Sequence, residues 1–390
     1  LVIIDEATQC DIASCLPAMY RGKHVVVVGD PKQLSHISFL SISTQSLIRK
    51  KYGLADLGES IDYRNLNILD FADGALVSQD QVTFLDEHYR SLPDIIKFSN
   101  EQFYAGSMKI MNVIPDDHSK SNIHHIAVTG SRDARGVNSN EVERIIQDLK
   151  VLIEDESSLG MAFCRSIGIL SPFRNQVDRF NEKILEVFSL DDIKRHNLLC
   201  GTAHSFQGEE RDIMMLSFCV DDKSHTTSFS HLDKPDVFNV TITRAKSVIR
   251  AYTSFDLSIL KGDSYLRAYL ESAKIESEKP VLKHFPHDAF LTEVQQELVA
   301  LNFKVRIGYE VADLSLDLAV ILDKQIIGVD LIGYPGYFKD GLALTAYKVL
   351  HRSKISTFPL PYSFWKFEKE RSLKSLIDFI NLTSDKKATE

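Results

Sequence analysis

The sequence predicts an α/β protein of two or three domains. Short apolar runs typical of buried strands alternate with segments of helical periodicity along the chain. The 390 residues, 44% hydrophobic and 25% charged, have the composition of a folded globular protein. Four consecutive valines, Val25 to Val28, suit a strand of a parallel sheet that is covered on both faces.

The first part of the chain is predicted to begin with a strand, a helix and a second strand, at residues 1–4, 11–20 and 24–28. Residues 41–81 have weak periodicity, which predicts connecting or inserted structure. A helix is predicted at 92–104, and the Gly- and Asp-containing loops of 106–138 place a domain boundary near residue 125.

Two further α/β parts are predicted beyond that boundary. The first has strands at residues 167–170, 198–202, 213–220 and 248–252, with a helix at 175–187. Residues 257–284 mix charged and short apolar groups, which predicts a linker. The last part has a helix with Phe290, Val294, Leu298 and Leu301 on one face, then strands at 304–307, 316–321 and 325–332.

Composition limits the class of protein. No apolar run approaches the roughly 18 residues of a membrane span, and the opening run lacks the length and basic flank of a signal peptide. The five cysteines are scattered without zinc-ligand spacing, which is typical of a reduced, cytoplasmic protein without structural zinc. The net charge of −9 argues against nonspecific coating of nucleic acid but leaves room for a local basic groove.

Adjacent carboxylates end the first predicted strand. Asp5 and Glu6 are therefore expected at the carboxyl edge of a sheet, where α/β folds bind ligands. One carboxylate can hold a magnesium ion and the other can orient an attacking water. Alone, such a pair is more often a solvated loop, so its neighbours in the sequence decide.

The valine strand delivers a second polar group to the same edge. Its sequence VVVVGDPKQL brings Gly29, Asp30 and Gln33, and the neutral amide of Gln33 could respond to a terminal phosphate. The alternative is an ordinary Gly-Asp-Pro turn.

Two arginines are candidates for stabilising charge on a transferred phosphoryl group. Arg90 follows Tyr89 just before a predicted helix in LDEHYRSLP, and Arg244 lies in FNVTITRAK. A surface ion pair is the alternative for Arg90.

The segment GTAHSFQGEE offers hydroxyls and backbone amides suited to phosphates, followed by acids suited to a ribose. Its polar and glycine residues are Gly201, Thr202, His204, Ser205, Gln207, Gly208, Glu209 and Glu210.

Together, DEATQ, GDPKQL, HYR, SFQGEE and NVTITRAK resemble, in this order, motifs II to VI of superfamily 1 helicases, most closely class 1B, the nonsense-mediated-decay type. The resemblance covers about residues 1–256 and implies two RecA-like P-loop NTPase domains. It implies ATP and Mg²⁺ as cofactors, with Asp5 on the metal and Glu6 as catalytic base. It also implies Gln33 as γ-phosphate sensor, Arg90 and Arg244 as arginine fingers, and Gly208 and Glu210 beside the nucleotide.

Members of this family grip single-stranded nucleic acid through loops of both domains. The resemblance therefore implies backbone contacts from Thr202, His204, Ser205, Pro172 and Phe173. Phe173 is equally well explained as a core residue or as a platform for base stacking.

The family also needs a phosphate cradle of the form GxxxxGK[ST], which this sequence lacks, since Gly22-Lys23 is followed by His24. In the family the cradle precedes the DEATQ strand. We therefore expect this chain to be the C-terminal part of a longer protein, with a first domain truncated before its Walker A region and no ATP hydrolysis by itself.

Residues of about 285–370 resemble the very-short-patch-repair-like nucleases of the PD-(D/E)xK class, a restriction-endonuclease-like fold. Glu293, Asp317 and Asp330 would supply the clustered carboxylates that hold a hydrolytic magnesium. Ile332 stands where the class usually has an acid or lysine, so the site is expected to be degenerate. Lys348 is a conceivable substitute.

The predicted domains are a partial RecA-like domain at 1–125, a second one at 126–256, a linker at 257–284 and the nuclease-like domain at 285–380. The expected function is ATP-dependent translocation or unwinding on single-stranded nucleic acid, with DNA favoured over RNA and no membrane. One alternative is an inactive helicase-like scaffold or nucleic-acid-binding protein. Another is a helicase whose tail is an active Mg-dependent nuclease.

Overall fold

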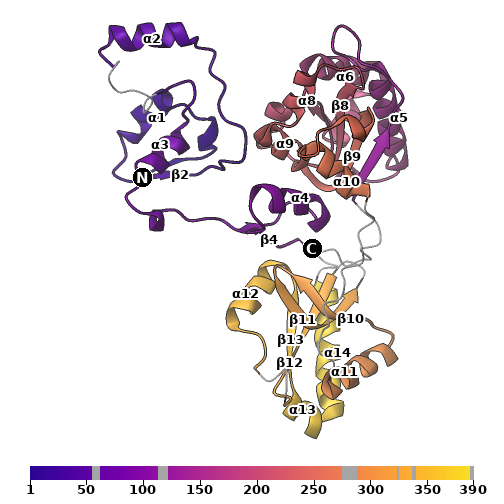
Figure 1. Cartoon of the computed structure of the whole chain (residues 1–390). Coiled ribbons are helices and arrows are strands. Elements are labelled where there is room, and N and C mark those ends of the chain that lie inside the picture. The colour runs from indigo at the N-terminus through magenta and orange to yellow at the C-terminus, as the bar shows by residue number, and fades with distance from the viewer. Residues whose placement is uncertain (55–61, 113–121, 275–287, 323–324, 336–339, 387–390) are drawn as a thin grey trace. The chain divides into compact units, whose positions relative to one another are not determined.

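The computed structural model describes residues 1–54, 62–112, 122–274, 288–322, 325–335 and 340–386 (Figure 1). Contacts divide the chain into two compact units. Unit 1 contains Leu1–Leu85 and His125–Leu270, and unit 2 contains Asp86–His124 and Glu271–Glu390. Both units combine strands and helices, which confirms the predicted α/β class.

The first part of unit 1 is small. Strands β1 (Val2–Ile4) and β2 (Val25–Val27) pair in parallel, and helices α1 (Ile12–Met19) and α3 (Ile68–Gly74) pack with them around Ile4, Ala7, Cys15 and Ile68. The expectation that the valine strand is covered on both faces is wrong: Ile3 is 63% and Val26 46% exposed. The reason is that the core cluster of this two-stranded sheet lies on the other face.

The segment predicted as connecting structure contains α2 (Ile42–Lys51) and α3. Helix α2 buries no residue, which explains its weak apolar periodicity. Residues 55–61 of this segment lie outside the described residues.

The second part of unit 1 has a five-stranded sheet in the order β5-β9-β8-β6-β7. Its strands are β5 (Ile123–Ala127), β6 (Ile167–Leu170), β7 (Leu199–Gly201), β8 (Arg211–Asp221) and β9 (Ala245–Ser254). Strand β6 is parallel to β7 and β8, and β8 is parallel to β9. The predicted strands are thus confirmed, and the completely buried side chains of β6 fit a parallel sheet.

Helices complete this part. They are α5 (Ser139–Asp155), α6 (Arg174–Val187), α7 (Leu190–Arg195), α8 (Thr226–Leu232), α9 (Pro235–Ile242) and α10 (Tyr265–Lys274). Helix α10 lies in the predicted linker, yet Leu266 and Tyr269 are buried. Tyr265 stacks on Phe238 of α9, and Tyr269 meets the same ring edge to face. The first part of α10, to Leu270, therefore belongs to unit 1. Residues 275–284 of the predicted linker lie outside the described residues, and its bounds stay a prediction.

Unit 2 is built on a sheet in the order β10-β11-β12-β13, with bounds Lys304–Val311, Leu314–Leu322, Gln325–Ile332 and Ser356–Pro361. Neighbouring strands are antiparallel except β12 and β13, which are parallel. Helices α11 (Ala289–Ala300), α13 (Tyr362–Phe367) and α14 (Lys369–Lys386) pack on one face. Helix α12 (Leu344–Arg352) packs on the other, against a second apolar cluster.

Unit 2 also contains an earlier segment of the chain, with β3 (Glu87–His88), α4 (Pro93–Phe103) and β4 (Lys109–Ile110). Strands β3 and β4 pair in parallel, and Met111 joins the cluster beside α12. The contact units therefore group the chain differently from the four predicted segments, whose boundaries stay a prediction.

Candidate functional site

The carboxyl edge of the β1–β2 pair carries the predicted acidic residues. The parallel register continues past both strands, with Val28 N donating to Ile4 O at 2.7 Å and Ala7 N to Val28 O at 2.9 Å. Asp5 and Glu6 are exposed at this edge, and Gly29 follows β2 beside them. A Cβ on Gly29 would lie 3.3 Å from the backbone nitrogen of Ala7, so glycine permits the close approach of the two loops.

Glu6 has a backbone conformation that few residues other than glycine adopt. Its φ is 50° and its ψ is 43°, in the left-handed region. Glu6 N donates to Asp5 Oδ1 at 2.8 Å, and Gln9 Nε2 donates to Glu6 Oε2 at 2.9 Å. Strained residues of this kind cluster at functional sites, and here the strain falls on the predicted catalytic base.

Gln33 is held at the same edge by Asp30. The side chain of Asp30 accepts from Gln33 Nε2 and from Lys32 N, each at 2.9 Å. This leaves the other end of the Gln33 amide, Oε1, directed to Arg244 Nη2 at 3.4 Å. The structure thus brings together a predicted phosphate sensor and a predicted arginine finger that are 211 positions apart.

Arg244 is almost wholly buried, with 2% of its surface exposed. It lies between α9 and β9, where Nε donates to Val240 O at 3.1 Å and Nη1 to Phe206 O at 3.4 Å. These carbonyl partners fix the guanidinium at the end of α9. Its remaining face, toward Gln33, lies where nucleotide phosphates are expected.

The loop after Gln33 packs on the second part of unit 1. Leu34 is 1% exposed and joins Ala203, Val237 and Val240 in a small apolar cluster. Asn239 Nδ2 donates to Lys32 O at 2.9 Å. The loop that bears Gln33 is therefore shaped by residues that lie far away in sequence.

The other residues predicted to contact the nucleotide are Gly208, Glu210 and Arg90. Gly208 has a φ of 74° in the turn before β8, and Glu210 forms an ion pair with Lys246 at 2.8 Å. Arg90 belongs to unit 2. The predicted roles of Arg90, Gly208 and Glu210 stay predictions.

The predicted nucleic-acid residues lie along the carboxyl edge of the second sheet. Pro172 and Phe173 follow β6, and Thr202 to Ser205 follow the adjacent strand β7. Thr202 and Ser205 cap the short helix between them, so part of their hydrogen-bonding capacity is used locally. Desolvation lowers the pKa of the exposed His204; His231 lowers it further and Asp236 opposes.

Phe173 is neither a core residue nor an open platform. The Arg132 guanidinium lies over its ring, 4.1 Å from the centroid, and the ring of His231 is 5.7 Å away. Arg132 in turn donates from N to Asp221 Oδ2 at 2.8 Å and from Nη1 to Ser228 Oγ at 3.0 Å. The arginine thereby connects the loop after β6 with the loop after β8.

A hollow of about 580 Å³ adjoins this arginine, and sequence reasoning missed it. Its lining includes Arg132, Arg135, Lys223 and His225, together with Asp133 and Asp221. Both acids accept hydrogen bonds from backbone amides. Asp133 accepts from Arg135 N and Val137 N, and Asp221 accepts from Arg132 N and Lys223 N. The basic residues can attract an anion, although Arg132 also donates to Ser228 and His225 Nδ1 accepts from Thr227 N. Arg132, Arg135 and Lys223 were the signal in the sequence.

A buried carboxyl group supports this edge. Glu141 of α5 is 0% exposed and accepts from Ser217 Oγ at 2.6 Å, Cys219 N at 3.0 Å and Ser254 Oγ at 2.9 Å. Burial raises the pKa of Glu141 to about 7, although these hydrogen bonds oppose the rise. Glu141 therefore ties α5 to the ends of β8 and β9.

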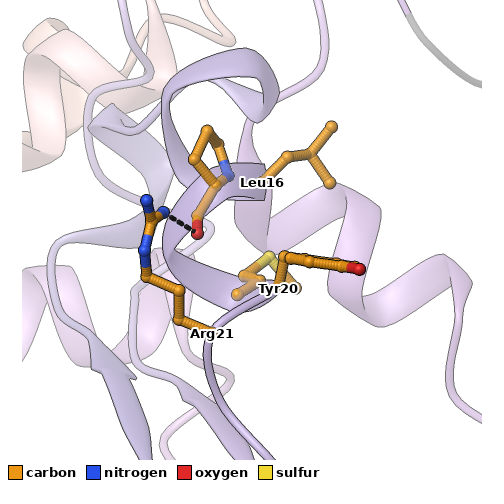
Figure 2. Close-up of a pocket in the computed structure, with 5 residues that line it drawn as sticks. Leu16, Tyr20 and Arg21 are labelled. Carbon is orange, nitrogen blue, oxygen red and sulfur yellow. Dashed lines mark hydrogen bonds between the residues drawn. The ribbon is translucent and has the colours of Figure 1, made fainter.

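Another hollow lies on α1 and has a different character (Figure 2). Its volume is about 660 Å³, and its lining residues are Leu16, Pro17, Met19, Tyr20 and Arg21. Figure 2 shows Arg21 turned back on the helix, where Nη1 donates to Pro17 O at 2.6 Å. No predicted site residue lines it, and its surface is mainly apolar.

The sheet of unit 2 brings two of the three predicted nuclease acids together. Asp317 on β11 and Asp330 on β12 lie on the face toward α12. Burial, together with the charges of Asp330 and Asp288, raises the pKa of Asp317 to about 7, although a hydrogen bond from Leu331 N opposes the rise. Glu293 instead pairs with Lys369 of α14 at 2.7 Å.

Asp330, the second of these acids, already accepts hydrogen bonds from the protein. Asp330 accepts from Leu342 N at 3.1 and 3.0 Å and from Tyr347 Oη at 2.5 Å. Lys348, the conceivable substitute, is exposed on α12, and its neighbour Tyr347 contacts the acid instead. A Cβ at Gly341 would lie 2.9 Å from Ile332 Cγ1, so backbone packs closely against the apolar residue.

Among the described residues, one further group of side chains has the chemistry of metal ligands. Atoms of Glu156, Cys164 and His196 lie within 4.8 Å of one another. Glu156 already accepts from Arg165 N at 2.8 Å and from its guanidinium, and His196 Nδ1 lies 3.0 Å from Arg165 O. Arg165 therefore takes up much of this cluster's bonding capacity. No helix among the described residues is long and apolar enough to span a membrane.

Comparisons with known proteins agree with the predicted motifs. Two family models, each described as an AAA domain, match residues 1–39 and 71–251. The putative helicase mov-10-B.1 of Danio rerio is 27% identical over 318 residues, covering 67% of this chain and 30% of the relative. Helicase SEN1 of Saccharomyces cerevisiae is 27% identical over 262 residues, covering 64% of this chain and 11% of the relative.

The chain therefore spans about a third or less of the length of these relatives, 30% and 11%. A solved structure of the PRRSV helicase is 15% identical over 65% of this chain and 34% of that chain, with a TM-score of 0.30, too low to support an argument. The predicted similarity to helicases of superfamily 1 is thus confirmed, and the chain is also similar to AAA domains. The nuclease-like resemblance stays a prediction.

Proposed function

We propose that this chain is the C-terminal part of an ATP-driven translocase or helicase that acts on single-stranded nucleic acid. The observation that carries the proposal is the convergence of Gln33 and Arg244 beside the sheet edge that bears Asp5 and Glu6. The similarity to helicases over about two thirds of the chain, 67% for one relative, supports it.

The residues present fit part of an ATP and Mg²⁺ site. The exposed carboxylates of Asp5 and Glu6 are the oxygen donors that magnesium and its waters prefer. Mg²⁺ would neutralise developing phosphate charge. Asp5 would hold the ion, and Glu6 would take a proton from the attacking water. Gln33 would hydrogen-bond a γ-phosphate oxygen, while Arg244 and Arg90 would stabilise its charge.

We propose the carboxyl edge of the second sheet as the nucleic-acid track. Thr202, His204, Ser205, Pro172 and Phe173 would contact the strand, and the basic hollow beside Arg132 would take a backbone phosphate. The Arg132–Phe173 pair provides a cationic surface over an aromatic ring, a combination suited to single strands. This places basic groups locally on a protein whose net charge is −9.

ATP hydrolysis by the full-length gene product, with and without single-stranded DNA or RNA, tests the proposal. Stimulation by the polymer should disappear in Glu6→Gln, because the water loses its base. Glu154→Gln is the matched control, since Glu154 is 64% exposed on α5 in a helical ion pair. Equal turnover by Glu6→Gln and the control would contradict the assignment of Glu6 as the base, whereas no turnover with either polymer would favour the inactive scaffold. We propose DNA over RNA as the preferred polymer, and parallel titrations with both decide.

A second candidate concerns unit 2 alone. We propose that its nuclease-like sheet does not cleave, because protein donors hold both oxygens of Asp330 and Ile332 cannot activate water. Magnesium-dependent nicking of supercoiled plasmid that is lost in Asp317→Ala would reverse this conclusion and establish the nuclease alternative.

A further inference from the structure

The segment that carries Arg90 is built into unit 2. In this segment β3 and β4 pair in parallel, with Glu87 opposite Lys109. Lys109 N donates to Asp86 O, and Lys109 Nζ pairs with the Asp86 carboxylate, each at 2.6 Å. Met111 N continues the pairing by donating to His88 O at 2.8 Å. The two short strands therefore hold one another in register immediately before Arg90.

An apolar anchor fixes this pair to the C-terminal sheet. Met111 is 2% exposed and belongs to the cluster that includes Tyr309, Leu316 and Leu350. Ser353, just after α12, places its Oγ 3.7 Å from the Met111 sulfur. Met111 thus fills space between the sheet and α12, and its burial orients β4.

A charged fork fixes the other strand. Arg352, the last residue of α12, donates from Nε to Glu87 Oε2 at 2.9 Å and from Nη2 to Glu87 Oε1. Tyr89 Oη also donates to this carboxylate, and the hydrogen bonds from Arg352 and Tyr89 hold the pKa of Glu87 below its usual value. A two-point arginine–carboxylate contact sets direction as well as distance.

These anchors flank Arg90 directly. Ser91 N donates to His88 Nε2 at 2.9 Å, and Asn112, the residue after Met111, donates from Nδ2 to Arg90 O at 3.2 Å. The backbone of Arg90 therefore lies between a strand that Arg352 holds and a residue that Met111 places. C-terminal residues supply both contacts: Arg352 holds Glu87, and the cluster around Leu350 holds Met111.

We propose that unit 2 serves as a positioning element for the Glu87–Arg90 segment, with Arg352 as a positioning residue that sets where Arg90 lies. The sheet and α12 of unit 2 thereby fix the segment that carries Arg90. The proposal rests on the proposed function in assigning Arg90 to the nucleotide, whereas the clamp itself depends only on the contacts above.

Hydrogen exchange of the backbone amides tests the clamp. In Arg352→Ala, amides from Glu87 to Ser91 should exchange about tenfold faster, because one fixed point is lost and this segment opens more often. Arg371→Ala is the matched control, since Arg371 is 73% exposed on α14 and pairs locally with Glu368. Met111→Ala should give the same local increase by removing the other anchor. Exchange in Arg352→Ala equal to that in Arg371→Ala overturns the proposal.

Steady-state kinetics of the full-length gene product then test the effect on turnover. Arg352→Ala should lower kcat about tenfold with little change in the KM for ATP, because misplacement of a charge-stabilising group weakens transition-state contacts. Arg352→Lys should recover only part of the rate, since lysine cannot make the fork. Glu87→Arg combined with Arg352→Glu should recover more than either single substitution, which a general loss of folding would not do.

The outcomes separate the two proposals. If the full-length gene product turns over no ATP with either polymer, the proposed function is wrong. If Glu6→Gln loses turnover while Arg352→Ala matches Arg371→Ala in kcat, only the positioning role is wrong. Faster exchange at Glu87–Ser91 together with a lower kcat supports both.

Discussion

Arg244 Nη2 lies 3.4 Å from Gln33 Oε1 and joins the edge of the first sheet to the end of α9. Asp30 fixes one end of the Gln33 amide, and two backbone carbonyls fix the guanidinium. An incoming γ-phosphate would compete for both groups at once. In the proposed function, this contact would couple phosphate binding to the packing of the two sheets of unit 1.

The first prediction concerns Arg244. Arg244→Lys should lower the kcat of polymer-stimulated ATP hydrolysis by about 100-fold or more, because one pre-organised donor to the developing charge is lost. Arg179→Ala, which removes an exposed helical ion pair on α6, should leave kcat unchanged. Thermal unfolding distinguishes a catalytic loss from a structural one, since Arg244 also supports Val240 and Phe206. Equal kcat values for the two variants would contradict the assignment.

The second prediction concerns the track. Phe173→Ala should weaken binding of single-stranded DNA about tenfold, because it removes the ring on which the Arg132 guanidinium rests. Arg132→Gln should weaken binding and also reduce the dependence of affinity on salt concentration by about one charge. Fluorescence anisotropy across a salt series measures both. An unchanged salt slope in Arg132→Gln would argue against a phosphate contact.

The third prediction concerns pH and Glu141. Its pKa of about 7 in the folded state exceeds the value near 4.5 of an unperturbed glutamate, so the folded protein holds the proton more tightly. The associated stability is fully present below about pH 4.5 and is lost as pH rises through about 7, amounting to roughly 3 kcal/mol. Glu141→Gln should flatten this part of the stability–pH profile in chemical denaturation. A profile as steep as that of the unmodified protein would contradict the buried proton.

The fourth prediction concerns Asp317, whose pKa is also raised to about 7 by burial. As with Glu141, the folded state holds the proton more tightly. The protonated Asp317 therefore stabilises unit 2 at low pH, and this contribution is lost as the pH rises through about 7. Asp317→Asn should therefore stabilise unit 2 at pH 8 relative to the unmodified protein, because an uncharged group replaces a buried charge. Magnesium should leave the unfolding temperature unchanged in both. A magnesium-dependent rise that Asp317→Asn abolishes would show a working metal site.

Most elements of the fold were predictable from local pattern. The strand at 167–170, the helix beginning near Asn175 and the strand at 325–332 follow from runs and periodicities that contacts within a few residues determine. Helix α10 was missed because its sequence mixes aromatic, apolar and charged residues, and its buried face is defined by ring contacts of Tyr265 and Tyr269 with the distant Phe238. The exposure of one face of the valine strand was also not predictable from the local pattern, because it depends on what packs against the sheet.

By itself, the sequence determined the α/β class, the order of the helicase-like motifs and the placement of Asp5 and Glu6 directly after a strand, because each depends on neighbouring residues. Tertiary structure alone decided that Gln33 contacts Arg244, that Arg132 covers Phe173 and that Arg352 holds Glu87. It also decided the raised pKa of Glu141. The physical reason is that these contacts join residues far apart in the chain, and desolvation depends on everything that packs around a group.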